Sequence, residues 1–207
     1  MEFKETKTYT LLARSFAGEC MAGMRYQILS DYATQQGYSS LAAELQTLAK
    51  NETFHAKRLM QLILTHANEC KNIDICAGYP FDGETLESGL KGAIDAEKNE
   101  ARIYLEFADI AQSEGFEDVA NTFKLMSAVE QEHKNKFAYL YKAFVDASLY
   151  KSTEKRLYRC ENCGHTYEDY EAWTICPLCR SSQGFVEINY PCEIKNEKNQ
   201  TRISKND

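Results

Sequence analysis

Four stretches of the chain repeat apolar residues at spacings of three and four, and ionisable residues interrupt each series. Such spacings place side chains on one face of an α-helix, so the pattern predicts four amphipathic helices. Glutamate or histidine stands where leucine or phenylalanine would continue the apolar face. The interrupting residues are Glu19, Glu52, His55, Glu97, Glu100, Glu130 and His133. The chain is therefore expected to bury several carboxyl groups in one helical core.

Glycine and proline mark the breaks between the four helices. Gly37 separates the first two, Gly115 separates the last two, and a long segment around Pro80 separates the second from the third. Two short connections and one long crossover are typical of a ferritin-like four-helix bundle. We expect residues 1–146 to form this bundle, so that the fold is mainly α.

The buried carboxylates require positive charge. An unpaired ionised carboxylate in a protein interior costs several kcal/mol, and no lysine or arginine occupies the matching level of the apolar faces. Metal ions are the natural counter-charge. Glu52-x-x-His55 and Glu130-x-x-His133 each place a carboxylate and an imidazole on one helix face, as a dinuclear centre requires. The alternative is that some of these residues lie on a solvent-exposed helix face.

Two tyrosines continue the same faces beyond the expected ligands. Tyr26 and Tyr104 are placed to donate hydrogen bonds to the carboxylates, although ordinary core packing accounts for them equally well. His66 and His165 lie outside the pattern, and we do not expect them to be ligands.

Four of the eight cysteines form a second motif, Cys160-x2-Cys163-x12-Cys176-x2-Cys179. Four thiolates suit tetrahedral zinc or a single iron about equally, and a structural zinc ribbon is the commoner use of such a motif. A redox-capable dinuclear centre in the same chain favours iron over zinc here, because an Fe(Cys)4 site can carry single electrons and a zinc site cannot. We expect Cys20 to be a small core residue and assign no function to Cys70, Cys76 and Cys192.

The remainder of the chain divides around this cysteine motif. Residues 147–156 lose the helical period and are predicted to be a linker. Residues 157–188 are predicted to form a small metal knuckle of short β-strands, with one strand at 185–188. Residues 189–207 are predicted to be a polar tail. The formal charge of −7 argues against nucleic acid and anionic membranes as partners. With no apolar leader and no long apolar run, we expect a cytoplasmic protein.

In their order and combination these motifs resemble rubrerythrin, over residues from about 5 to 188. The segments that carry the resemblance are FAGECMAGMRY, NETFHAKRL, AEKNEARIYLEFADIA, SAVEQEHKNKF and the two CxxC pairs. The resemblance implies a di-iron (Fe-O-Fe) centre in the bundle and a rubredoxin-like mononuclear Fe(Cys)4 domain. It also implies that Glu100 is an extra carboxylate ligand and that one iron moves between Glu100 and His55. The crossover with Cys70 and Cys76, His165 and the long tail depart from the family pattern.

The activity that this resemblance implies is the reduction of hydrogen peroxide to water in protection against oxidative stress. Electrons would pass through the Fe(Cys)4 site from an external NAD(P)H-linked reductase or rubredoxin, and the chain would form a homodimer or a higher homo-oligomer. Three alternatives remain open at this point. They are an iron-handling or ferroxidase protein, a helical scaffold with a structural zinc ribbon, and an oxygen-activating enzyme with an apolar substrate.

Overall fold

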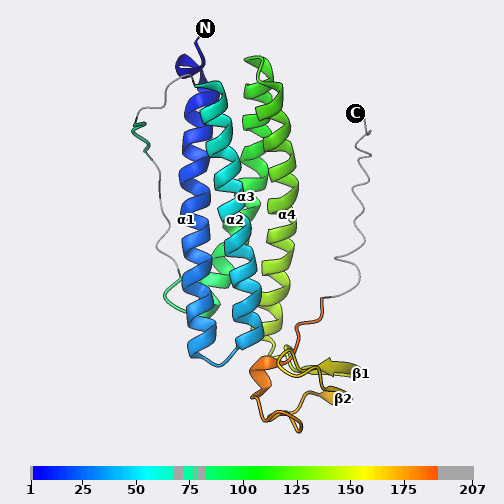
Figure 1. The fold of residues 1–207 in the computed structure, drawn as a ribbon. Helices are drawn as coiled ribbons and strands as arrows, with labels where there is room; N and C mark the ends of the chain where they lie inside the picture. Colours follow the sequence, from blue (N-terminus) through cyan, green and yellow to red (C-terminus); the bar gives the residue numbers. More distant parts are fainter. Residues whose placement is uncertain (1, 68–71, 77, 79–82, 191–207) are drawn as a thin grey trace.

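The computed structural model describes residues 2–67, 72–76, 78 and 83–190. Four long helices run side by side, and a small β-unit lies at one end of them (Figure 1). The helices are α1 (Lys7–Gln35), α2 (Ser39–His66), α3 (Leu86–Ser113) and α4 (Glu117–Val145). The strands are β1 (Lys151–Arg159) and β2 (Thr166–Glu171), and short 3-10 helices occupy Phe3–Glu5 and Gln183–Phe185. The predicted mainly α, ferritin-like fold with a C-terminal knuckle is confirmed.

The helix ends follow from local chemistry. The Thr6 hydroxyl accepts a hydrogen bond from the backbone N–H of Tyr9 and caps α1, and Thr85 and Ser88 form a reciprocal capping box at the start of α3. Gly37 and Gly115 both take positive φ values just after a helix. Glycine adopts this conformation without strain, so each ends one helix and permits a sharp turn into the next. Both short connections therefore lie where the sequence predicts them.

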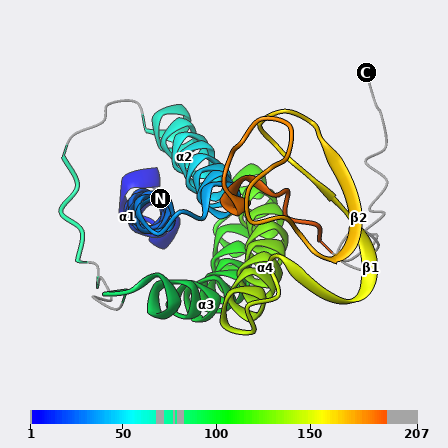
Figure 2. The ribbon, with the colours of Figure 1, turned by 90° about the horizontal axis from the view of Figure 1, so that it is seen from below.

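The four helices form two hairpins, α1 with α2 and α3 with α4, that pack into one bundle (Figure 2). Two apolar clusters fill its interior. The cluster nearer the knuckle includes Leu41, Leu45, Leu90, Phe137 and Leu140. The other includes Leu12, Leu59, Leu62, Phe107 and Phe123. The ionisable residues singled out in the sequence lie between these clusters, so the apolar core is divided by a polar layer.

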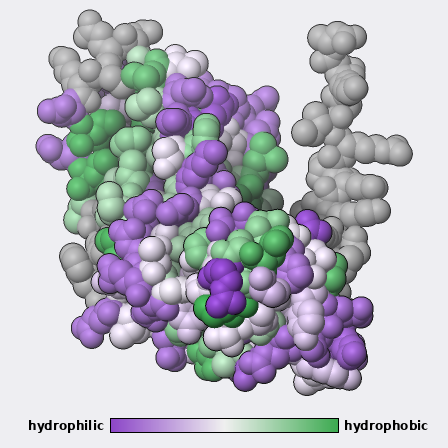
Figure 3. All heavy atoms as spheres, turned by 60° about the horizontal axis from the view of Figure 1, so that its bottom comes forward, coloured by the Kyte–Doolittle hydropathy of each residue, from purple (hydrophilic) through white to green (hydrophobic). Residues whose placement is uncertain are grey.

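Hydrophilic side chains cover much of the surface visible in Figure 3, and apolar side chains form smaller groups there. Within the described ranges, no helix has the length and apolar character needed to cross a bilayer.

The knuckle differs from the sequence prediction in two ways. β1 begins at Lys151, so six residues of the predicted linker 147–156 form a strand instead. They are polar because this two-stranded antiparallel ribbon is largely exposed, and exposure hides the strand pattern. The prediction of a strand at 185–188 is wrong. The chain forms a 3-10 helix over Gln183–Phe185, and within 185–188 only Val186 pairs, in a single bridge with Cys160.

The knuckle is held against the turn between α1 and α2. The buried Ser40 hydroxyl donates a hydrogen bond of 2.6 Å to Glu161 Oε2, and the rings of Tyr38 and Tyr150 stack with centroids 6.3 Å apart. Gly184 lies so close to the turn that a Cβ atom added there would be 1.8 Å from the carbonyl oxygen of Gly37. Only glycine fits at this backbone contact.

We therefore expect Gly184→Ala to displace the knuckle from the helix end, because neither backbone segment can yield as a side chain would. Small-angle X-ray scattering should show a larger radius of gyration, with the helical circular-dichroism signal unchanged. Gly18→Ala is the matched control, since a Cβ atom there would meet nothing within 4 Å. An unchanged scattering curve for Gly184→Ala would contradict this account of the contact.

Candidate metal centres

The polar layer of the bundle receives side chains from all four helices. Glu19 comes from α1, Glu52 and His55 from α2, Glu97 and Glu100 from α3, and Glu130 and His133 from α4. Glu52, Glu97 and Glu130 are completely buried, and Glu19 and His133 are nearly so. These residues therefore continue the buried helix faces, as the apolar spacing predicts.

Six of the seven predicted residues assemble into two overlapping groups. The first contains Glu19, Glu52, His55 and Glu130, and the second contains Glu52, Glu97, Glu130 and His133. In each group the candidate donor atoms all lie within 4.8 Å of one another. Glu52 and Glu130 belong to both groups, which is the arrangement of two carboxylates that bridge a pair of metal ions.

The imidazoles face the shared carboxylates. His55 Nδ1 lies 2.8 Å from Glu52 Oε2 and 3.1 Å from Glu130 Oε1. His133 Nδ1 lies 2.9 Å from Glu52 Oε1 and 2.9 Å from Glu130 Oε2. Each histidine thus points one nitrogen at both bridging candidates from its own side of the layer.

The donor atoms fit a metal pair better than they fit one another. Among the residues that the structure describes, several buried polar atoms of this layer make no hydrogen bond of good geometry, even where a nitrogen and an oxygen approach within about 3 Å: Glu52 Oε1, Glu97 Oε2, both carboxylate oxygens of Glu130 and His133 Nδ1. Buried acceptors left in this state are costly. Two divalent ions bound by carboxylate oxygen and imidazole nitrogen would satisfy them.

Two tyrosines lie beside the outer carboxylates of the layer. The buried Tyr26 hydroxyl donates to Glu97 Oε1, and the buried Tyr104 hydroxyl donates to Glu19 Oε1. Glu97 Oε2 has no other partner among the described residues, and Glu19 Oε2 lies 3.3 Å from His55 Nδ1. Each tyrosine therefore holds one oxygen of an outer carboxylate, and on Glu19 the second oxygen faces His55 Nδ1.

Glu100 lies outside both groups. It lines a separate cavity of about 230 Å³ between α1 and α3, together with Arg25 and Tyr104. Burial, with the carboxylates of Glu130 and Glu52, raises the pKa of Glu100 to about 8, although Arg25 opposes the shift. Its assignment as a ligand stays a prediction.

The knuckle brings its four cysteines together as predicted. Cys160 Sγ lies 3.7 Å from Cys179 Sγ, Cys163 Sγ lies 3.7 Å from Cys176 Sγ, and all four sulfurs lie within 4.8 Å of one another. Each CxxC pair is followed by a residue with positive φ, Gly164 or Arg180, whose backbone N–H donates to the carbonyl of the first cysteine of the pair. The result is a tetrahedral thiolate site for iron or zinc.

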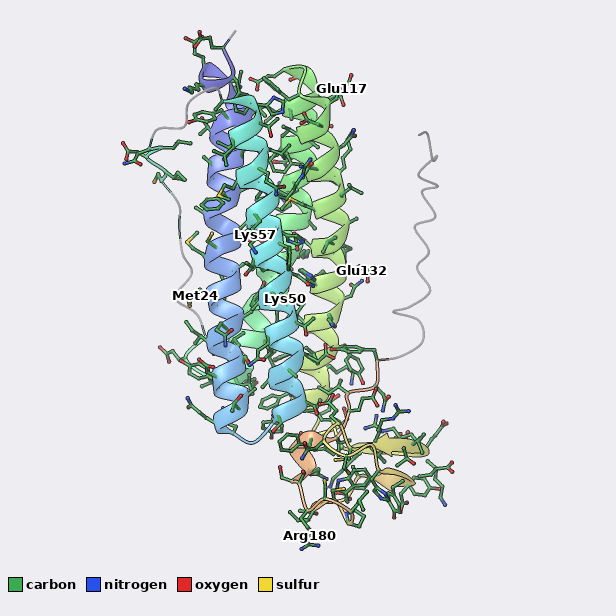
Figure 4. The ribbon with its side chains drawn as sticks, viewed as in Figure 1. Met24, Lys50, Lys57, Glu117, Glu132 and Arg180 are labelled. Atoms are coloured by element: carbon green, nitrogen blue, oxygen red, sulfur yellow. The ribbon has the colours of Figure 1, made fainter. Side chains whose placement is uncertain are left out.

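Two features of the structure differ from or go beyond the sequence prediction. Cys20, expected in the core, is exposed and lines a groove of about 690 Å³ between α1 and α2. Its neighbour Glu19 points inward, and one helical step of 100° turns Cys20 outward. The same face carries Met24, Lys50 and Lys57 (Figure 4).

The second feature is Asn51, whose Nδ2 lies 3.2 Å from His133 Nε2. In the sequence, the only indication that Asn51 belongs to the site is its position directly before Glu52.

Without metal, the charges of the bundle centre make its stability depend on pH. Burial and neighbouring carboxylates raise the pKa values of Glu19 and Glu97 well above 4.5. The folded chain therefore keeps these protons at pH values where the unfolded chain has lost them, and the stability of the fold decreases as the pH rises above 4.5. Despite burial, carboxylate partners raise the pKa of His133 from 6.5 to about 9, so its stabilising charge is lost as pH rises through that range. Despite burial, hydrogen bonds from His133 and His55 lower the pKa of Glu52 to about 2, so its contribution is lost only below 4.5.

We therefore expect the metal-free bundle to have its highest melting temperature between pH 4.5 and 6.5 and to lose stability towards pH 9. Bound metal should reverse that slope, because its ligands must be deprotonated. Thermal unfolding followed by circular dichroism at pH 5, 7 and 9, with and without metal, checks both signs. A metal-free melting temperature that rises steadily from pH 5 to 9 would show that the carboxyl groups are not buried as described.

Comparison with known proteins agrees with this architecture. The sequence profile of the family described as "Rubrerythrin" matches residues 10–73 and 89–168, and that of "Rubrerythrin, rubredoxin-like domain" matches residues 158–185. The chain is 36% identical to a rubrerythrin of Clostridium perfringens over 188 residues, which cover 89% of this chain and 95% of the relative. It is 26% identical to a rubrerythrin of Nitratidesulfovibrio vulgaris over 187 residues, with 89% and 95% covered.

Solved structures share the fold. A mixed-valence nigerythrin matches with a TM-score of 0.58 at 21% identity, over 89% of this chain and 90% of that chain. A bacterioferritin of Desulfovibrio desulfuricans matches with a TM-score of 0.62 at 19% identity, over 68% of this chain and 81% of that chain. The second match covers less of this chain, and at these identities both establish the fold alone. The family profiles and the sequence relatives establish more: this chain belongs to the rubrerythrin family, with its di-iron domain and its rubredoxin-like domain.

Proposed function

We propose that this protein is a cytoplasmic peroxidase that reduces hydrogen peroxide to water at the bundle centre, with electrons delivered through the four-cysteine site. The observation that carries this proposal is the pair of donor groups that share Glu52 and Glu130 in a buried layer. A redox-active metal pair fits these donors, and the same chain holds a thiolate site suited to one-electron transfer. The combination supports a reductase of a small oxidant.

The reaction requires two electrons and two protons, because H2O2 + 2e⁻ + 2H⁺ gives two H2O. A pair of ferrous ions held by this chain would supply the two electrons and would act as Lewis acid and template. The chain's own residues would hold that pair: Glu19 and His55 on one side, Glu97 and His133 on the other, and Glu52 and Glu130 between them. The apolar clusters above and below the layer limit the access of water to it.

Tyr26 and Tyr104 fix the outer carboxylates. By donating to one oxygen each of Glu97 and Glu19, they leave the second oxygen of each carboxylate available to a metal ion. This arrangement would keep these two carboxylates in one orientation while the charge of the centre changes. Glu100 lies one helical turn beyond Glu97, in the cavity beside Tyr104, and we assign it the role of the additional ligand that exchanges with His55.

The four-cysteine site lies far from the bundle centre of its own chain. The knuckle contacts α2 at Ser40, twelve residues before Glu52. At 1.5 Å per residue the two points are about 18 Å apart along the helix. A shorter path exists if the knuckle of a second copy approaches the middle of the bundle. We therefore propose a homodimer or higher homo-oligomer, reduced by an external NAD(P)H-linked reductase or rubredoxin.

We expect Glu100→Ala to slow the oxidation of the pre-reduced protein by peroxide by about 10- to 100-fold, as is typical when a group that supports a metal centre is lost. The bundle should stay folded, because Glu100 lies at the edge of the buried layer. Stopped-flow absorbance measures the rate. Glu106→Ala is the control, since this exposed glutamate of α3 pairs only with Arg102 on the same helix among the described residues. Equal rates for Glu100→Ala and the unmodified protein would refute the assigned ligand exchange.

Cys160→Ser separates chemistry from electron supply. We expect this variant, with its bundle reduced chemically beforehand, to react once with peroxide at the unmodified rate, and steady-state turnover with an enzymatic reductase to fall to background. Cys76→Ser, which changes an exposed cysteine outside the motif, should affect neither. Normal steady-state turnover by Cys160→Ser would exclude the knuckle as the route for electrons.

A further inference from the structure

The two histidines of the bundle centre are held differently. His133 directs Nδ1 at the carboxylates, and its other ring nitrogen, Nε2, lies 3.2 Å from the side-chain amide of Asn51. For His55, no hydrogen bond to Nε2 is found within the described part of the chain. The His55 side chain is also more open to solvent, at 15% exposure against 5% for His133.

The contact with Asn51 is made across the bundle. Asn51 precedes Glu52 on α2, whereas His133 belongs to α4. Two consecutive residues of α2 therefore hold one imidazole from both sides: Glu52 Oε1 lies 2.9 Å from Nδ1, and the Asn51 amide lies against Nε2. The ring can neither rotate nor withdraw without breaking one of these contacts.

An amide suits this position whether Nε2 accepts or donates a hydrogen bond. In a neutral imidazole with its proton on Nδ1, Nε2 accepts a hydrogen bond, which the Asn51 NH2 group can donate. Once a metal occupies Nδ1, the proton is on Nε2 and must be donated, and the Asn51 carbonyl oxygen can accept it after the amide turns over. Aspartate could serve only the second state, and leucine could serve neither.

We propose that Asn51 is a positioning residue that fixes the ring of His133 and so makes His133 the more firmly held histidine ligand of the centre. This inference rests on the proposed function, which makes both histidines metal ligands. It assigns the difference between the two metal positions to a residue outside the donor set, and it predicts that removing Asn51 weakens one position only.

The test is metal binding by the full chain, with the knuckle first loaded with zinc. Cobalt(II) is then titrated into the metal-free bundle without air, in competition with a chromophoric chelator, and the visible absorption of the bound cobalt is recorded. The unmodified protein should bind two cobalt ions in the bundle. Asn51→Leu, similar in size, should weaken one of them by about 10- to 100-fold and leave the other within about twofold. Asn51→Asp should restore the weakened position, because its carboxylate accepts the Nε2 proton.

Asn135→Leu is the matched control. Asn135 lies on α4 near His133, but its side chain bonds Gln131 at 3.2 Å, away from the centre. Both cobalt ions should bind to this variant as to the unmodified protein. The inference fails if Asn51→Leu binds both ions normally, or if Asn51→Asp is as weak as Asn51→Leu, which would indicate a packing role. An unmodified bundle that binds no cobalt would instead overturn the proposed function, and this inference with it.

Discussion

Four almost completely buried carboxylates face one another in the middle of the bundle, and the rest of the structure is arranged around their mutual repulsion. Two histidines direct one nitrogen each at this layer, and two tyrosines donate to one oxygen on each outer carboxylate. Apolar clusters on both sides supply the packing that keeps the layer closed. A helical bundle can hold such a layer because every helix keeps its backbone hydrogen bonds internally while it offers a side chain to the centre.

The same arrangement accounts for the division of the fold into two parts. The bundle centre is sheltered on both sides, so external proteins cannot approach it closely along the helix axes. The knuckle is small, and two of its four cysteines are only partly buried, so it is open to an external electron donor. Its contact with the α1–α2 turn rests on a backbone approach at Gly184 and on the Ser40–Glu161 hydrogen bond. Under the proposed function, the first site would carry out the sheltered chemistry and the second would exchange electrons with a partner.

Much of this could be predicted from the sequence. Glutamate rarely interrupts an apolar helix face unless a counter-charge meets it there, so Glu19, Glu52, Glu97 and Glu130 are recognisable, and the CxxC spacing defines the knuckle. Features that depend on the packing of separate helices are out of reach. Spacing along one helix cannot show that Asn51 meets His133 on another, that Glu100 turns into a side cavity, or that Cys20 faces a groove. The polar strand β1 has the composition of a linker because a two-stranded exposed ribbon needs no apolar alternation.

The central claim is that the bundle holds a redox-active iron pair that reacts with peroxide. Metal content per chain, on protein prepared without air, followed by rapid mixing of the reduced form with hydrogen peroxide, tests it most directly. The account predicts about three irons per chain, two of them oxidised together in a fast first phase. Two irons and one zinc would contradict the electron route and favour iron handling, and a bundle without iron would contradict the account altogether.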